Sequence, residues 1–295
     1  ALCMPMVELV GKKHITRIDD PIYVLNKHDD LENESKEHLE SQKESDGLIR
    51  LLPPRKRLEF KFKKNKNITT LIGSCDSYSP LWKNFDILFD KYWGLETENI
   101  LVSETVSQLD TPFIQNYKVL TDGTGLKWGE RILKSLEHIK TPYVFFILDD
   151  YYLTESLSEE FINEKLSLMK KYNADKLLFD IKYPHYTLKE LEKNKIYQFE
   201  MSSEYLNSVQ PGIWKLDYLK KVLKPEYSPW DFEIAGNDFA SQQKGIILLD
   251  RLDPIEDGND IETKKILFRF YHNFVRIGGK ISEGWEELYK RENLN

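Results

Sequence analysis

Short apolar runs alternate with longer amphipathic stretches from about residue 66 onward. Four of the runs are rich in β-branched and aromatic residues and are bounded by small or polar residues, which is typical of strands. They cover residues 68–75, 99–104, 143–148 and 175–181. We therefore predict a strand at each of these places.

Between the runs, apolar residues recur with a spacing near 3.6, which predicts helices. Three such stretches cover residues 81–93, 128–139 and 158–172, the last with Ser158 as its N-cap. A fourth helix is expected at about residues 262–277, because two glycines follow it as a stop signal.

The alternation of strands and helices favours an α/β fold with an open, mostly parallel sheet flanked by helices. The sequence YVFFIL, residues 143–148, is apolar at every position. A strand of this kind is buried on both faces, as a central parallel strand is. We expect it near the middle of the sheet.

The first 65 residues differ from the rest of the chain. They are dense in charge, show little apolar periodicity and contain Pro53–Pro54. This pattern indicates an appendage or linker. We predict an N-terminal appendage at residues 1–65 and a separate domain at residues 66–295 that folds on its own.

Composition narrows the function classes. The chain of 295 residues is 40% hydrophobic and has a formal net charge of -7 from interspersed acids and bases, so nucleic acid is not an expected partner. Cys3 and Cys75 lie far apart, which argues against a disulfide framework or a zinc site and fits a reducing compartment. No run of about 18 apolar residues and no signal-peptide pattern occurs, so we expect a cytoplasmic protein.

Two adjacent aspartates, Asp149 and Asp150, follow the most apolar strand. Ligands of open α/β sheets bind beyond the carboxyl ends of the strands, so we expect this pair to face a crevice. Two like charges this close need a cation or a basic contact, and hard carboxylate oxygens suit Mg²⁺ or Mn²⁺. The alternative is an acidic turn without a ligand.

A second polar segment follows the first strand. In GSCDSYSPLW, residues 73–82, small residues allow close approach of a ligand to the backbone. Asp76 and Tyr78 could hydrogen-bond to and stack on a nucleotide base ahead of a helix N-terminus, and Cys75 belongs to the same expected cofactor contacts. The alternative is an ordinary capped loop.

Four segments carry a resemblance to a known family. They are LIGSCDSYSPLWKNFDILFDKYW, KWGERILKSLEHIKTPYVFFILDDYYL, SVQPGIWKLDYLKKVLKPEYSPWDFE and FYHNFVRIGGK, in this order between residues 68 and 280. Together they resemble bacterial glycosyltransferases with the GT-A fold, a Rossmann-like sheet, that act in surface polysaccharide synthesis, including capsular and lipopolysaccharide. The resemblance implies a nucleotide-sugar donor and a saccharide or lipid-linked saccharide acceptor.

The same resemblance assigns roles to the acidic pair and its neighbours. Asp149 and Asp150 correspond to the acidic D-x-D motif that holds a divalent cation against the donor diphosphate, and Asp76 belongs to the base-binding loop. The position two after Asp149 is Tyr151 rather than an acid, which leaves the metal requirement open. Tyr151 is expected to contact substrate. Arg131 could contact the diphosphate; the alternative is a surface arginine.

A transferase of this class needs a carboxylate that removes the proton of the acceptor hydroxyl. SPWDFE offers Asp231 and Glu233 in an aromatic setting with Trp230, whose ring could support a sugar. We predict Glu233 as the base, with Asp231 second. The alternative is that the aromatic residues are core and the acids are solvated.

Two further stretches resemble parts of this family. QPGIW, with Gln210 and Trp214, resembles a stretch that closes the acceptor side, where Trp214 could stack on a sugar; packing is the alternative. Residues 4–30 resemble the closing portion of other bacterial glycosyltransferase domains. If so, this chain is the C-terminal part of a two-domain transferase.

Two other function classes stay open from the sequence. One is a non-catalytic carbohydrate- or partner-binding module that keeps the fold, since the second acid of D-x-D is missing. The other is a glycoside hydrolase with paired carboxylates. A homo-oligomer and peripheral contact with the inner face of the membrane are compatible with each.

Overall fold

The computed structural model describes a defined part of the chain. It covers residues 65–105, 117–121, 125–179, 186–250 and 286–294, and the backbone of four short strands at 266–267, 270–271, 275–276 and 280–281. The chain divides into two units, Ala1–Phe62 and Lys63–Asn295, and only the second contains described residues. The predicted appendage therefore lies outside the described residues, Asn65 apart, and its boundary stays a prediction.

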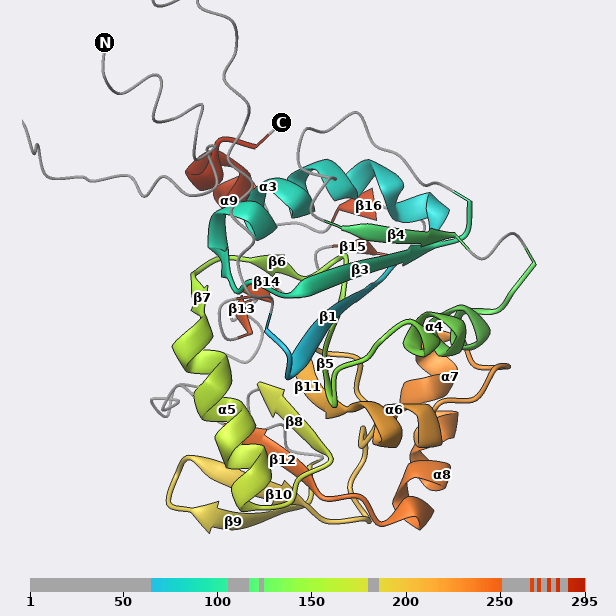
Figure 1. Ribbon diagram of the computed structural model, residues 1–295, viewed down its shortest axis with the longest axis vertical. Helices are drawn as coiled ribbons and strands as arrows, with labels where there is room; N and C mark the ends of the chain where they lie inside the picture. Colours follow the sequence, from blue (N-terminus) through green and yellow to red (C-terminus); the bar gives the residue numbers. More distant parts are fainter. Residues whose placement is uncertain are drawn as a thin grey trace, which may run out of the picture. The chain divides into compact units, whose positions relative to one another are not determined.

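A nine-stranded sheet forms the centre of this unit (Figure 1). Its strands in spatial order are β4 (Lys118–Thr121), β3 (Glu98–Ser103), β1 (Ile68–Gly73), β5 (Tyr143–Leu148), β11 (Gly212–Lys215), β8 (Lys176–Phe179), β12 (Ile247–Asp250), β10 (Ile196–Phe199) and β9 (Leu188–Glu192). β4, β3, β1 and β5 are mutually parallel, as are β8 and β12. β11 and β10 run antiparallel to their neighbours. The predicted open, mostly parallel α/β sheet is confirmed.

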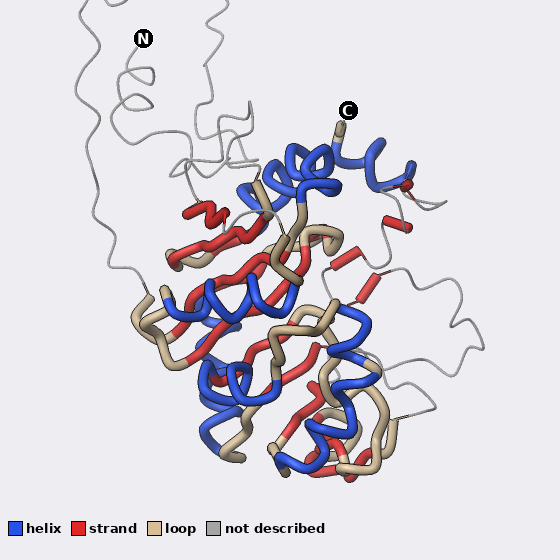
Figure 2. The backbone as a smooth tube through the Cα atoms, turned by 90° about the vertical axis from the view of Figure 1, so that its right-hand side faces the viewer, coloured by secondary structure: helices blue, strands red, loops and turns tan. Residues whose placement is uncertain are grey.

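Helices cover both faces of the sheet, as Figure 2 shows from the side. They are the 3₁₀ helix η3 (Asp76–Leu81), α3 (Trp82–Tyr92), α4 (Trp128–Glu137), α5 (Glu159–Lys171), α6 (Leu216–Val222), α7 (Pro229–Glu233), α8 (Ala235–Gln243) and α9 (Glu286–Glu292). α3, α5 and α9 pack on one face, and α4, α6, α7 and α8 on the other. Small strand pairs are β2 (Trp93–Gly94) with β7 (Leu157–Ser158), β13 (Ile266–Leu267) with β14 (Phe270–Tyr271), β14 with β6 (Tyr152–Leu153), and β15 (Val275–Arg276) with β16 (Lys280–Ile281).

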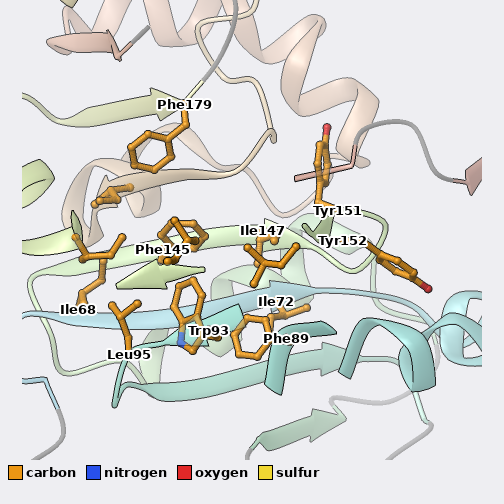
Figure 3. Packing of buried hydrophobic residues seen from close by; sticks show 14 of the residues in the cluster. Ile68, Ile72, Phe89, Trp93, Leu95, Phe145, Ile147, Tyr151, Tyr152 and Phe179 are labelled. Carbon is orange, nitrogen blue, oxygen red and sulfur yellow. The ribbon is translucent and has the colours of Figure 1, made fainter. Parts of the chain in front are cut away.

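The central strand β5 is buried on both faces, as its sequence predicts. Phe145 packs with the α3 and α5 side of the core, where its ring centroid lies 5.0 Å from that of Trp93 and 6.2 Å from that of Phe179 (Figure 3). Val144 and Phe146 pack with the α4 and α7 side. A continuous apolar run is therefore required, because neither face of β5 meets water.

The predicted helices at residues 81–93, 128–139 and 158–172 are confirmed as α3, α4 and α5 within about two residues. The N-cap at Ser158 is also confirmed, since its side chain accepts a hydrogen bond from the amide of Phe161 at 3.2 Å. This bond satisfies an amide that the first turn of α5 leaves unpaired.

The predicted helix at residues 262–277 is wrong. Three two-residue strands, β13, β14 and β15, occupy this region. The stretch ILFRFYHNFVRI is rich in aromatic and β-branched residues, which favour extended backbone and lose side-chain freedom in a helix. β14 pairs antiparallel with β6, the short strand that follows the turn after β5.

The last helix, α9, is anchored on α3. Leu288 is buried in the same core cluster as Tyr152, and the amide of Asn84 donates to the hydroxyl of Tyr289 at 2.6 Å. Glu292 accepts hydrogen bonds from Lys91 and Tyr92 at 2.6 and 2.8 Å. The C-terminal helix thus supports the element that follows the first loop of the candidate site.

Candidate functional site

Three adjacent parallel strands, β3, β1 and β5, end at one edge of the sheet. The amide of Ser74 donates to Val102 at 2.9 Å, and the amide of Asp149 donates to Gly73 at 3.3 Å, so the three chains leave the sheet side by side. Glu104, Cys75 and the acidic pair follow these strand ends. The sequence prediction that the first loop and the acidic pair lie together is confirmed by these contacts.

Asp149 points into the protein rather than toward solvent, contrary to the expectation that both acids face a crevice. It is 4% exposed. Its Oδ2 accepts a short hydrogen bond from Ser74 and one of 3.0 Å from the indole Nε1 of Trp82, which also lies 2.7 Å from the Ser74 hydroxyl. Burial and then the charge of Asp150 raise the pKa of Asp149 to about 8. At neutral pH this side chain is a protonated acid that ties the loop after β1 and helix α3 to the end of β5.

Asp150 is the charged member of the pair. It is partly exposed, but its Oδ1 is buried and has no hydrogen-bond partner among the described residues. Burial raises its pKa to about 6, and the nearby Glu233 contributes in the same direction. An unsatisfied buried carboxylate oxygen is costly in the free protein, so this position suits a cation or a hydrogen-bond donor.

The protonated state of Asp149 has a consequence for stability. Between its ordinary pKa of 3.8 and its folded pKa of about 8, the folded protein holds a proton that the unfolded chain releases. The free energy of unfolding should therefore fall as the pH rises, by up to about 1.4 kcal/mol per pH unit between about pH 6 and 8. In Asp149→Asn this slope should disappear, because the amide oxygen still accepts from Ser74 and Trp82 without titrating. Urea unfolding at several pH values measures it.

Asp231→Asn is the matched control for this slope. Asp231 is exposed, and its hydrogen bonds with Ser228 lower its pKa, so it stays ionised across the same pH range. Asp231→Asn should keep the wild-type slope of unfolding free energy against pH. If Asp149→Asn keeps this slope as well, Asp149 is not the group that holds the proton.

The loop after β1 is fastened to the loop after β3. The carboxylate of Asp76 accepts hydrogen bonds from the amides of Glu104 and Thr105 at 3.1 and 2.9 Å and a short one from the hydroxyl of Thr105. In return, the amide of Asp76 donates to Glu104 at 3.1 Å. Asp76 therefore shapes the predicted base-binding loop, and direct contact with a base stays a prediction.

Arg131 lies behind this loop on α4. It is 4% exposed, so the alternative of a surface arginine is wrong. Its Nη1 donates to Glu104 and to the carbonyl of Leu126, both at 2.9 Å. The guanidinium thus holds Glu104 in place, and its predicted contact with a diphosphate stays a prediction.

Cys75 and Tyr78 lie close to the acidic pair. The Cys75 sulfur is 3.1 Å from the Ser77 hydroxyl, and burial, with the charges of Asp149 and Glu104, raises the pKa of the thiol. Burial raises the pKa of Tyr78, with Asp150 as the largest charge contribution. The partly exposed Tyr78 ring therefore lies within electrostatic reach of Asp150, in the loop predicted to receive a nucleotide.

Asp231 and Glu233, the two candidate bases, lie in different environments. Asp231 forms a capping box with Ser228 at the start of α7, and its carboxylate accepts from the Ser228 amide at 2.9 Å. Glu233, at the end of the same helix, is largely buried and accepts from the amide of Val209 at 2.7 Å. Burial raises the pKa of Glu233, and its charge reaches Asp150. The geometry favours Glu233 over Asp231 as a base.

The predicted sugar contacts divide into exposed and buried residues. Trp230 is 57% exposed one turn from Glu233, so its ring is accessible. Trp214 is fully buried in β11, which corrects the expectation that it stacks on a sugar, because the strand crosses the centre of the sheet. Gln210 is buried just before β11, and Tyr151 is 7% exposed, with its ring turned away from that of Tyr152 (Figure 3). Substrate contacts of these two stay predictions.

Of the two adjacent aspartates, Asp150 is the one whose carboxylate could hold a divalent cation. Asp149 has its Oδ2 engaged by Ser74 and Trp82, whereas Asp150 offers an unpartnered oxygen. Within the described ranges, no three His, Cys, Asp or Glu side chains gather as a metal site. Mg²⁺ is commonly held by one or two carboxylates together with substrate phosphates, and one carboxylate is what this edge provides.

Glu104, Ser74 and Trp82 lie at this site but were not predicted from the sequence, nor was Lys176, a buried lysine of β8 that lowers the pKa of Glu233. Glu104 follows a strand in the same way as the acidic pair, so the strand-end rule could have found it. Lys176 opens the strand KLLF, where a lysine in an otherwise apolar run is a signal of a buried charge. Ser74 and Trp82 carry no such signal, because their hydrogen bonds with Asp149 depend on the packing of α3.

No protein-family description and no curated protein matches this sequence. Several solved structures are similar to part of this chain. S. aureus TarS is 13% identical over 63% of this chain and 35% of its own, with a TM-score of 0.44. A structure of S. aureus TarS 1-349 in complex with UDP is 14% identical over 63% of this chain and 58% of its own, with a TM-score of 0.43.

A third structure is the bifunctional IspDF from Campylobacter jejuni, 17% identical over 63% of this chain and 50% of its own, with a TM-score of 0.40. This chain thus spans between about a third and three fifths of these three proteins. Similarities at this level assign the chain to no family. In the part of the chain that the structure describes, no helix combines the length and the apolarity needed to cross a bilayer.

Proposed function

We propose that this chain is a glycosyltransferase of the GT-A type that transfers a sugar from a nucleotide-sugar donor to a saccharide or lipid-linked saccharide acceptor of a bacterial surface polysaccharide. The observation that carries the proposal is the environment of Asp150. It follows the central parallel strand, has a buried oxygen without a partner, and lies within electrostatic reach of both Tyr78 and Glu233.

The protonation states support one negative charge in the acidic pair. With a pKa of about 8, Asp149 is mainly protonated at neutral pH, whereas Asp150, with a pKa of about 6, is mainly ionised. A single carboxylate facing a donor diphosphate repels it less than two would. A divalent cation held by Asp150 would neutralise charge on the departing diphosphate. The loop with Asp76 and Tyr78 would bind the nucleoside.

Glu233 is the proposed general base. Its carboxylate takes the proton of the acceptor hydroxyl while the acceptor oxygen bonds to the anomeric carbon, and the bond from that carbon to the diphosphate breaks. The nucleoside diphosphate leaves with the electron pair of that bond. Partial burial, which raises the pKa of Glu233, makes the carboxylate a stronger base than an exposed glutamate.

A non-catalytic binding module is the second candidate. The engagement of Asp149 by Ser74 and Trp82, which withdraws one of the two acids from a ligand, favours it. Such a module would bind a saccharide through exposed groups such as Trp230 and would have no need of a nucleotide.

Calorimetric titration with UDP, GDP, CDP and CMP sugars, with and without Mn²⁺, separates the two candidates. The transferase should bind at least one nucleotide sugar and should release the free nucleotide when an acceptor is present. A chain that binds none of these donors, with or without the cation, would refute the proposal.

A further inference from the structure

Lys176 carries a charge into the centre of the protein. It opens β8 and is 0% exposed. A lysine is almost never fully buried unless it is paired, because removing an ammonium group from water is costly. Neither the core packing nor the proposed chemistry described above requires a cation at this place.

The ammonium group organises the loop that leads into β11. Its Nζ donates to the carbonyls of Leu206 and Ser208, both at 2.9 Å, and lies 4.0 Å from the ring centroid of Trp214. Val209 follows directly, and its amide donates to Oε1 of Glu233 at 2.7 Å. The Ser208 carbonyl that Lys176 holds and the Val209 amide that holds Glu233 therefore belong to the same planar peptide unit.

The opposite side of this loop is held by the junction of α7 and α8. The amide of Leu206 donates to the side chain of Asn237 at 2.8 Å, and the side chain of Asn207 donates to the carbonyl of Gly236 at 3.1 Å. The loop has no ladder of strand hydrogen bonds, so side chains define its shape. The two hydrogen bonds of Lys176 connect this loop to β8 of the sheet.

The charge of Lys176 acts on Glu233 in addition to the hydrogen bonds that Lys176 makes with the loop. Burial raises the pKa of the Glu233 carboxyl, whereas the Val209 amide, Lys176 and Ser208 lower it, in that order of size. Asp150 faces it from the turn after β5. Lys176 is the cation among these groups, and its side chain is fully buried.

We propose that Lys176 is a positioning residue for Glu233, which fixes the loop at residues 206–209 so that the Val209 amide holds the Glu233 carboxyl in one orientation beside Asp150. The inference rests on the proposed role of Glu233 as base. It adds that this base depends on a cation in the sheet that touches neither donor nor acceptor.

The test compares Lys176→Met with a variant that changes another buried lysine. Methionine keeps most of the buried volume and removes both hydrogen bonds and the charge. The control is Lys165→Met/Asp250→Asn, because Lys165 is also buried but pairs with Asp250 at 2.8 Å, away from Glu233. We expect Lys176→Met to lower kcat at least tenfold at unchanged donor Kd. The acidic limb of the kcat–pH profile should move to higher pH, because Lys176 lowers the pKa of Glu233. The control should change stability alone.

Hydrogen exchange of the Val209 amide gives a readout that needs no substrate. Exchange at Val209, relative to core amides of β5, should speed up at least tenfold in Lys176→Met and less in Lys176→Gln, which keeps one donor. Unchanged exchange at Val209 in both folded variants, or equal losses of kcat in Lys176→Met and the control, would overturn the inference. If Lys176→Met does not fold, Lys176→Gln alone carries both measurements.

The two proposals fail in different ways. If the wild-type protein binds and turns over no nucleotide sugar, the proposed function fails, and the exchange at Val209 still decides whether Lys176 fixes the loop. If the wild-type protein is active and Lys176→Met retains its kcat and its pH profile, the role of Lys176 fails while the transferase stands.

Discussion

Replacing Glu233 with glutamine should lower kcat by about 10²–10⁴-fold, the range that a positioned general base contributes. The glutamine oxygen can still accept from the Val209 amide, which Glu233 holds at 2.7 Å, so the loop and α7 should keep their geometry. What is lost is the capacity to take a proton. Donor affinity, measured by titration calorimetry, should stay within about threefold of the wild type, since this side chain has no role in donor binding.

Asp231→Asn is the control on the same helix. The capping box with Ser228 weakens, so the free energy of unfolding should fall slightly, with little change in kcat. Retained turnover in Glu233→Gln together with a large loss in Asp231→Asn would exchange the two assignments. Loss of donor binding in Glu233→Gln would instead show that the carboxylate belongs to the donor site.

The pH profile gives a second measure of the same base. Because burial raises the pKa of Glu233 above its ordinary 4.5, kcat in the wild type should fall on the acidic side at a pH higher than for an exposed glutamate. This acidic limb should be missing from the residual activity of Glu233→Gln.

Much of the fold follows from the pattern of the sequence. The apolar run of β5 predicts a central strand because a strand covered by helices on both faces is mostly apolar, and Ser158 predicts the start of α5 through its hydroxyl. The same reasoning failed at residues 262–277. Apolar residues there are frequent enough to match a helical spacing. Strands form instead, because these residues prefer extended backbone and because β14 pairs with β6.

The candidate site was predictable as far as topology determines it. Strand ends of a parallel sheet meet at one edge, so Asp149 and Asp150 had to approach the loop with Asp76. Which of the two acids points inward was not predictable, because it depends on the Trp82 indole of α3. The position of Trp214 was also missed, since an antiparallel strand inserted between two parallel ones requires pairing partners that lie far away in the chain.

Asp150→Asn should weaken nucleotide-sugar binding in the presence of Mn²⁺ by about 10–100-fold. A charged hydrogen bond or ion contact contributes about 1.5–3 kcal/mol, and each 1.4 kcal/mol is tenfold in affinity. The amide keeps the shape of the side chain but removes the negative charge beside Tyr78 and Glu233. Titration calorimetry with and without Mn²⁺ measures both the loss and its cation dependence, which should be small in the variant.

Asp149→Asn is the matched control. It shows whether both aspartates bind the divalent cation or Asp150 alone does. Since Asp149 is mainly protonated at neutral pH and accepts from Ser74 and Trp82, its amide should bind donor within about threefold of the wild type. Equal losses in the two variants would mean that both carboxylates face the cation, as in a strict D-x-D motif. Wild-type affinity that is unchanged by removal of the cation would instead mean that Asp150 contacts the donor directly, through a hydroxyl or amide of the ligand, because its buried oxygen still needs a partner.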